Sequence, residues 1–423
     1  MAAGLPWNAF DLDRDAVRSR FDWATRQGNP YWLWPDTLVD HWQEALCRIE
    51  LITRQIMIEG ASDQVLSGNA EATGIAAFTS GMGPLLGYWL GQGLFEADEP
   101  IAAIMDLHLR HNSKRMQRLA RHATSVVEHL ARRGVQATVL KGMQTAQVCF
   151  PVPGARPMSD IDLLVSPRDC RAAGAALAEL DFVPGRKVDL PPQQCWRLAG
   201  TPDWPCSLSL THADNGWYVD LQTALGRRYS AGAPMIALDL LLELEAPQPW
   251  ALSAKAAALG PVSSVLHLAC HASCGLENVT MIRLVELALV IRNGARSPGY
   301  WTSFAQIGER TGTLASAYPA LLLSDNLVPG LIPEELLELA RSRTPRRVRR
   351  VVAALTPANA QRVHRCSLEE RFMWTSSWTA RLRQIVIEIL PLHIPWRELL
   401  HVYKMRGWRV LRGKLTRRAR QGF

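Results

Sequence analysis

The chain has 423 residues, of which 48% are hydrophobic and 20% are charged, as in an ordinary globular protein. This composition excludes a wholly disordered chain, a collagen and a coiled-coil rod. The 47 basic residues outnumber the 39 acidic residues by eight, and the eight basic residues between Lys404 and Arg420 account for this whole excess. The positive charge therefore belongs to a C-terminal tail, and nucleic acid is not expected to be the main substrate.

Two features of the chain bear on where the protein is located. The first 15 residues contain no basic stretch followed by an apolar run, and the eight cysteines form no CxxC pair. The expected location is therefore cytoplasmic. Residues 72–95 carry no charge, but their six glycines and one proline argue against a membrane-spanning helix. They favour a glycine-rich loop with a short buried helix.

Hydrophobic periodicity predicts helices at both ends of the chain and a small αβ unit between them. Helices are expected at 38–58 and, as one or two amphipathic helices, at 101–133, ending before Gly134. Shorter helices are expected at 143–149 and 167–180. Strands are expected at 137–140 and 160–165, and as a hairpin of 207–212 and 217–221. From about residue 235 onward the pattern is helical again.

This order of elements predicts an α+β fold, with a small mixed-sheet core embedded in N- and C-terminal helical regions. A chain of this length can bury a large core without disulfides or structural metals. We expect four parts: a helical region at 1–100, the core with a paired-acid strand at 101–230, a second helical region at 231–384 and an apolar-to-basic terminal segment at 385–423.

Two aspartates lie two residues apart on the predicted strand 160–165. The side chains of Asp160 and Asp162 therefore leave the same face of this strand. The other face is expected to be buried by three apolar residues: Ile161, Leu163 and Leu164. A third acid, Asp220, stands between apolar residues in the predicted strand 217–221.

Acids within apolar strands need a physical reason, because neighbouring carboxylates repel one another and a bare carboxylate is costly to bury. Divalent cations held by oxygen ligands supply one. Two such ions would also bind a nucleoside triphosphate and polarise the phosphorus under attack. On spacing alone an alternative stays open, in which Asp160 is a turn residue and Asp162 faces solvent, because D-x-D is a short and common string.

Several strings in the chain together resemble a known family. They are VLKG at 139–142, RPMSDIDLLV at 156–165, LDF at 180–182, YVDL at 218–221, LHLACHA at 266–272 and RLVELAL at 283–289. The combination resembles the uncharacterised nucleotidyltransferase family, part of the DNA polymerase β-like nucleotidyltransferase superfamily. The resemblance implies a nucleotidyltransferase core and a metal-dependent enzyme. Such an enzyme moves a nucleoside monophosphate from a nucleoside triphosphate, such as ATP, to a hydroxyl or phosphate acceptor.

The resemblance also implies residue roles. Three acids would bind Mg²⁺ or Mn²⁺: Asp160, Asp162 and Asp220. Asp220 would also act as general base, and Gly142 would let the backbone approach the triphosphate. Lys141 and Arg156 would neutralise phosphate charge. The alternative for both cations is an ion pair with one of the acids that only holds the strands together.

The chain departs from the superfamily pattern at three positions. Met143 stands where a serine is usual, Gln222 where a histidine often follows the third acid, and Glu286 where an aspartate is usual. A second hypothesis is therefore a catalytically inactive nucleotide-binding or adaptor protein. The resemblance alone suggests tailoring of modified peptides, secondary metabolites or polysaccharides, with a small-molecule, peptide or glycan acceptor.

Two further patterns have competing explanations. His267, Cys270, His271 and Cys274 share one face of a predicted helix, but they extend over about 10 Å, so all four cannot surround one zinc ion. The two histidines are expected in the core or facing the cleft. The basic tail follows an apolar stretch at 385–392. It suits either contact with a membrane surface, phosphorylated glycan or nucleic acid, or a solvated terminal helix.

Overall fold

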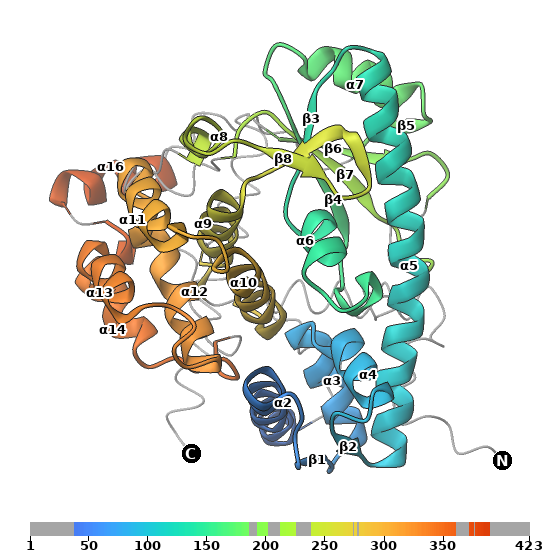
Figure 1. Ribbon diagram of the computed structural model, residues 1–423, viewed down its shortest axis with the longest axis vertical. Coiled ribbons are helices and arrows are strands. Elements are labelled where there is room, and N and C mark those ends of the chain that lie inside the picture. The colour runs from blue at the N-terminus through green and yellow to red at the C-terminus, as the bar shows by residue number, and fades with distance from the viewer. Residues whose placement is uncertain are drawn as a thin grey trace.

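The computed structural model describes residues 38–185, 193–201, 212–225, 238–273, 275–276, 279–360, 372–375 and 377–389. Within these residues a seven-stranded mixed sheet is preceded and followed by helices, which confirms the predicted α+β fold (Figure 1). The strand predicted at 207–212 lies outside the described residues except for His212, and the basic tail lies outside them entirely.

The N-terminal part of the described chain is helical. Its elements are α2 (Val39–Glu59), β1 (Val65–Leu66), α3 (Ala70–Ser80), α4 (Gly83–Gly91) and β2 (Glu96–Ala97). The uncharged segment 72–95 thus forms two helices, not a loop with one short helix. A Cβ on Gly87 would overlap the carbonyl oxygen of Met105, so glycine lets α4 lie directly against the next helix. No helix among the described residues is long and apolar enough to cross a bilayer.

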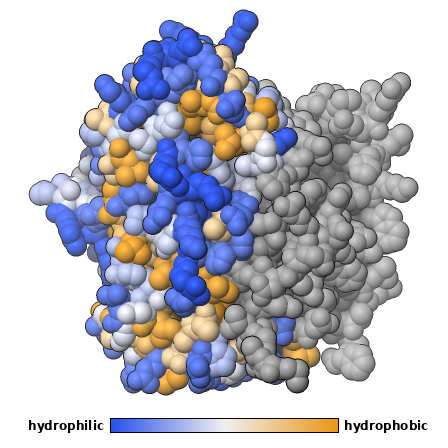
Figure 2. Space-filling view, turned by 90° about the vertical axis from the view of Figure 1, so that its right-hand side faces the viewer, coloured by the Kyte–Doolittle hydropathy of each residue, from blue (hydrophilic) through white to orange (hydrophobic). Residues whose placement is uncertain are grey.

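Helix α5 (Glu99–Arg132) is a single helix of 34 residues that runs along one side of the molecule, from the N-terminal helices to the sheet (Figure 1). Its buried residues recur every three or four positions between Ile101 and Leu130, which confirms the predicted amphipathic pattern. Gly134, with a φ of 75°, follows its end as predicted. Hydrophilic side chains form a band down the middle of the face that α5 presents (Figure 2).

The sheet has the strand order β5-β6-β7-β4-β3-β9-β8. Its strands are β3 (Ala137–Val139), β4 (Asp160–Val165), β5 (Phe182–Pro184), β6 (Gln193–Leu198), β7 (Tyr218–Gln222), β8 (Gln248–Trp250) and β9 (Ser253–Ala258). The expectation that the chain is helical from about residue 235 is wrong for β8 and β9. The sequence of β9, SAKAAA, has no β-branched residue, and its parallel pairing with β3 makes it a strand.

Helices connect the strands and form the C-terminal part. Those near the sheet are α6 (Gly142–Val148), η2 (Pro153–Ala155), α7 (Cys170–Ala178), η3 (Leu238–Leu240) and α8 (Leu241–Leu244). The later ones are α9 (Pro261–Ala272), α10 (Met281–Gly294), α11 (Tyr300–Thr311), α12 (Leu314–Leu327), α13 (Glu334–Arg343), α14 (Arg346–Val352) and α16 (Trp378–Ile389). Helix α10 contributes Val285 to the N-terminal hydrophobic cluster and Leu287 to the C-terminal one, so it joins the two helical parts.

The two faces of β4 pack against different helices. Ile161, Leu163 and Val165 cluster with buried residues of α5 and α7. Leu164 packs on the opposite face, in the cluster of α9 and α10. The expectation that Leu164 shares a face with Leu163 is therefore wrong, because the two-residue period of a strand places it on the face of the two aspartates.

Strand β7 is parallel to β4 and antiparallel to β6. The hairpin predicted for 207–221 is therefore not the pairing that the described residues show, although the turn before β7 is present. In that turn the amide of Asn215 donates to the carbonyl of His212 over 3.2 Å. Strands β5 and β6 are not predicted from the sequence.

A buried arginine holds the two segments that lead into β4 and β7. Arg115 on α5 is 1% exposed, and its guanidinium donates to backbone carbonyls of both segments. The acceptors are Met158 at 2.8 Å, Ser159 at 3.3 Å, Asn215 at 2.6 Å, Gly216 at 3.0 Å and His212 at 3.5 Å. Because each strand begins just after these carbonyls, Arg115 fixes where the two strands start relative to each other.

We predict that Arg115→Met lowers the free energy of unfolding by about 3 kcal/mol or more, because several buried carbonyls lose their donor. Arg115→Lys keeps a charged donor and should cost less. Urea unfolding followed by circular dichroism measures both changes. Arg121→Met, at an exposed position of the same helix, is the control and should change the free energy by less than about 0.5 kcal/mol. An Arg115→Met variant as stable as this control would contradict the role of Arg115.

Candidate active site

Three aspartates from two neighbouring strands meet on one face of the sheet. Strands β4 and β7 are parallel, and their register sets Asp162 directly opposite Asp220. Asp160 lies two residues before Asp162 and so leaves the same face. One carboxylate oxygen from each aspartate lies within 4.8 Å of the other two. The structure therefore brings together the three acids that the sequence pattern selects.

These carboxylates are largely removed from solvent. Asp162 and Asp220 are 7% and 6% exposed, so Asp162 does not face solvent, and Asp160 is partly buried. Burial, together with the negative charges of Asp162 and Asp220, raises the pKa of Asp160 to about 6. The positive charges of Lys141 and Arg156 act in the opposite direction. The raised pKa shows that the nearby cations offset only part of the repulsion and the burial cost.

The donor set fits a hard divalent cation. Three carboxylates offer only oxygen ligands, which Mg²⁺ and Mn²⁺ prefer, and a bound cation would relieve the repulsion between them. Across the described part of the chain, this triad is the one group of three or more acidic, histidine or cysteine side chains close enough to hold an ion.

The histidine and cysteine pattern on α9 does not form a second such group in the described residues. His267 and Cys270 are buried, and Cys274 lies outside the described residues. The thiol of Cys270 donates to the carbonyl of Thr313 over 3.6 Å. His267 and Cys270 therefore belong to the helical core, as expected for one of the two histidines, whereas His271 is half-buried.

Asp162 is held by two donors, one from the turn after β3 and one from β7. Nζ of Lys141 donates to Oδ1 of Asp162 over 2.7 Å, and Nε2 of Gln222 donates to the same oxygen over 2.6 Å. The side chains of Lys141 and Asp162 are each 9% exposed. Lys141 therefore forms the ion pair with an aspartate of the triad that the sequence leaves open as an alternative to a role in phosphate binding.

The backbone at Lys141 has an unusual conformation, with a φ of 50° and a ψ of −131°. Residues that carry a Cβ rarely adopt this region, and they keep it only where the surroundings impose it. Here the carbonyl of Lys141 accepts hydrogen bonds from the amides of Gln144 and Thr145, both at 3.0 Å. With its ammonium bound to Asp162, Lys141 is held at both its backbone and its side chain.

Arg156 lies beside the triad, but its partner is Glu286 on α10. Nε of Arg156 donates to Oε1 of Glu286 over 3.1 Å, and Nη2 donates to Oε2 over 2.8 Å. Nη1 donates to the carbonyl of Pro157 over 3.0 Å. Glu286 is 2% exposed and also accepts a hydrogen bond from Oγ1 of Thr145. The alternative in which Arg156 pairs with a site aspartate is therefore wrong.

Gly142 packs against the guanidinium of Arg156. A Cβ built on Gly142 would overlap Nη1 and Cζ of Arg156. A side chain at this position would therefore have to displace the guanidinium of Arg156.

Thr145 and Arg115 are not predicted as functional from the sequence, and Glu286 is noted there only as a departure. The sequence pattern marks two of these three residues, Glu286 and Arg115, as unusual. Glu286 is a lone acid in an otherwise apolar stretch of α10, and Arg115 falls on the buried stripe of α5, three residues after Asn112 and four before Leu119. A charged residue at a core position of an amphipathic helix indicates a buried polar contact.

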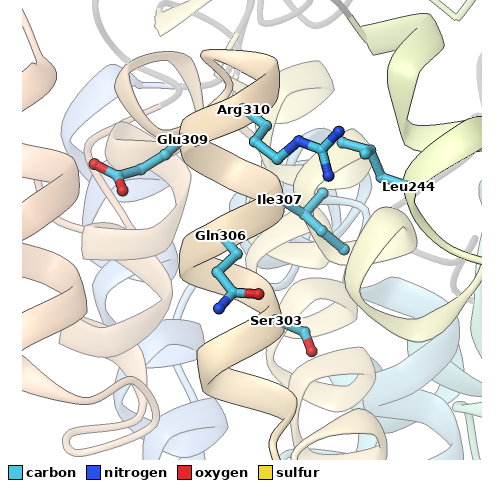
Figure 3. A pocket seen from close by; sticks show the side chains of 6 residues that line it. All are labelled: Leu244, Ser303, Gln306, Ile307, Glu309 and Arg310. Atoms are coloured by element: carbon cyan, nitrogen blue, oxygen red, sulfur yellow. The ribbon is translucent and has the colours of Figure 1, made fainter.

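A pocket of about 350 Å³ lies between α8 and α11 (Figure 3). Its lining residues are Leu244, Ser303, Gln306, Ile307, Glu309 and Arg310. Glu309 is engaged by Arg343 over 2.7 Å. The pocket contains none of the three aspartates and does not form part of their site.

The family model of the uncharacterised nucleotidyltransferases matches residues 74–329. The chain belongs to this family. The matched region of this nucleotidyltransferase-family protein contains the acid triad, Lys141, Arg156 and Glu286. Comparison with the curated proteins and with the solved structures gave no match. Family membership supports nucleotidyl transfer as the general reaction and a nucleoside triphosphate as substrate.

The raised pKa of Asp160 predicts that the stability of this nucleotidyltransferase-family protein depends on pH. An aspartate in the unfolded chain has a pKa near 4, whereas that of Asp160 in the fold is about 6. Between these values the folded state keeps a proton that the unfolded state releases, so stability falls as pH rises from about 4 to about 6. Two pKa units correspond to about 3 kcal/mol. Asp160→Asn should remove this contribution and raise the melting temperature at pH 7 in the absence of divalent ions.

Thermal unfolding between pH 4 and pH 7, with a chelator present, measures this effect. Asp106→Asn, at an exposed position of α5, is the control and should follow the wild-type profile. Added Mg²⁺ should stabilise the wild type at pH 7 more than Asp160→Asn, because the variant has lost one of the three clustered carboxylates. If the melting temperatures of the wild type and Asp160→Asn changed in parallel with pH, the raised pKa of Asp160 would be contradicted.

Proposed function

We propose that the protein is a metal-dependent nucleotidyltransferase that moves a nucleoside monophosphate from a nucleoside triphosphate to a hydroxyl or phosphate acceptor. The observation that carries this proposal is the convergence of three carboxylates, two of them buried and one partly buried, on adjacent parallel strands. A fixed register sets Asp162 opposite Asp220, and the site lies within the region that the family model matches. Three largely buried acids at this spacing are costly unless a cation binds between them.

The proposed ligands of Mg²⁺ or Mn²⁺ are Asp160, Asp162 and Asp220. A bound divalent ion supplies charge neutralisation and polarises the phosphorus under attack. Asp162 would hold the ion while its Oδ1 also accepts hydrogen bonds from Lys141 and Gln222. The ammonium of Lys141, adjacent to the triad, is proposed to neutralise charge on the triphosphate.

In the proposed reaction, the acceptor oxygen forms a bond to the α-phosphorus as the bond between this phosphorus and the oxygen bridging to the β-phosphate breaks. Pyrophosphate leaves with the electron pair of the broken bond. The proton of an acceptor hydroxyl passes to the carboxylate of Asp220 as general base, whereas an ionised phosphate acceptor has no proton to transfer.

The acceptor class extends this proposal. A small molecule, peptide or glycan in a biosynthetic tailoring reaction suits the family resemblance, and nucleic acid is not the proposed main substrate. Peripheral membrane contact through the basic tail and a cytoplasmic location remain predictions, and the tail lies outside the described residues.

A second candidate is a nucleotide-binding or adaptor protein without turnover. The observation that favours it is the pair of donors on Asp162, because Lys141 and Gln222 together compensate this carboxylate without an ion. Such a protein would bind a nucleoside triphosphate with metal but release no pyrophosphate.

We predict that at least one of the four nucleoside triphosphates binds only with Mg²⁺ or Mn²⁺, and that Asp160→Asn/Asp162→Asn weakens this binding more than about 100-fold. Isothermal titration calorimetry measures the binding, and circular dichroism verifies that the variant is folded. Asp214→Asn is the control, because Asp214 precedes β7 but is exposed.

Absence of binding with either metal, or unchanged binding by the folded double variant, would overturn the proposed site. A coupled assay for pyrophosphate, run with small-molecule, peptide and glycan acceptors, separates the two candidates. Metal-dependent binding without pyrophosphate release from any acceptor class would favour the inactive protein.

A further inference from the structure

We infer that Glu286 is a positioning residue for the nucleotide site, and that it holds the Lys141–Gly142 turn from helix α10 through Arg156 and Thr145. The effect of Glu286 on catalysis rests on the proposed function. The effect of Glu286 on the structure of the turn can be tested without any nucleotide.

The guanidinium of Arg156 is held in one orientation by its hydrogen bonds. All three of its nitrogens donate, two of them to Glu286 and one to the carbonyl of Pro157. The side chains of Arg156 and Glu286 are 15% and 3% exposed, so the two charges compensate each other in a nearly dry environment. A planar guanidinium held at all three nitrogens cannot turn toward a phosphate without leaving Glu286.

The fixed guanidinium of Arg156 lies against the Lys141–Gly142 turn. It occupies the space where a side chain at Gly142 would lie. One helical turn further, Oγ1 of Thr145 donates to the same carboxylate of Glu286. Glu286 therefore reaches the turn at two points, through the arginine that covers Gly142 and through the first turn of α6.

The Lys141–Gly142 turn needs support from its surroundings. Lys141 has a backbone conformation that a residue with a Cβ keeps only under constraint. This conformation places its ammonium on Asp162. Helix α10 is a rigid support, because its side chains pack into both the N-terminal and the C-terminal hydrophobic clusters. Loss of the Glu286 charge should therefore relax the turn and release Lys141 from the acid triad.

Hydrogen exchange of the full chain, measured by mass spectrometry without nucleotide or metal, tests this structural part. Glu286→Gln and Thr145→Val should raise exchange in the segment 140–149 by about 10-fold or more. Thr145→Ser keeps the hydroxyl and should behave as wild type. A matched control is Glu179→Gln, because Glu179 binds Nε and Nη2 of Arg133 at 3.1 and 2.5 Å, in the same two-bond arrangement but at the exposed surface.

Unchanged exchange at 140–149 in both Glu286→Gln and Thr145→Val would overturn the inference. If Glu286→Gln fails to fold, Thr145→Val carries the test, because it removes one hydroxyl and keeps the shape of the side chain. This result does not depend on nucleotide binding. A wild type that binds no nucleoside triphosphate would overturn the proposed function and leave the exchange measurement decisive for Glu286.

Kinetics then separate a positioning pair from a phosphate ligand. For a positioning pair, Glu286→Gln and Arg156→Lys should each lower kcat by about 10- to 100-fold with a smaller change in nucleotide affinity. The double variant should be no worse than the worse single variant, because both changes break the same contact. For a phosphate ligand, Glu286→Gln would free the guanidinium and tighten nucleotide binding. Tighter binding by this variant would overturn the inference.

Discussion

The candidate site depends on the register between two parallel strands that are far apart in the sequence. Asp162 of β4 faces Asp220 of β7 in one register only, and a slip by one residue would turn Asp220 to the opposite face of the sheet. Arg115 helps to fix this register, because its guanidinium binds backbone carbonyls of the residues just before both strands. Its fork of donors suits such a task, since one rigid group can bind several carbonyls at fixed directions. Burial of its charge is costly, and these charge-assisted hydrogen bonds offset the cost.

The electrostatics of the site follow from how its two cations are paired. Arg156 is paired with Glu286, whereas Lys141 is paired with Asp162, so two cations face four carboxylates. The acids therefore keep an excess of negative charge, and the raised pKa of Asp160 has this excess as one of its causes. A divalent cation would remove it. The site thus combines the Arg156–Glu286 ion pair, which has a structural effect, with a cluster of three aspartates whose negative charge favours binding of a cation.

Local sequence patterns predicted those features that depend on neighbours in the chain. The helices α2 and α5 and the strands β3, β4 and β7 follow from periodicity, and the three acids follow from short strings that resemble a family. Strand β9 could not be predicted because its alanines carry no strand preference and its pairing with β3 decides its conformation. The contacts of Glu286 with Thr145 and Arg156 bridge separations of 141 and 130 residues, so no local pattern specifies them.

The family match extends beyond the sheet to the helices that make these long-range contacts. The matched residues, 74–329, begin in α3 and continue just beyond α12, so they include helices on both sides of the sheet. A sheet alone would supply the three aspartates, but it would supply neither Arg115 from α5 nor Glu286 from α10. Both side chains are buried and reach the segments that carry the acids or Lys141. The geometry of the site therefore depends on how these helices pack against the sheet.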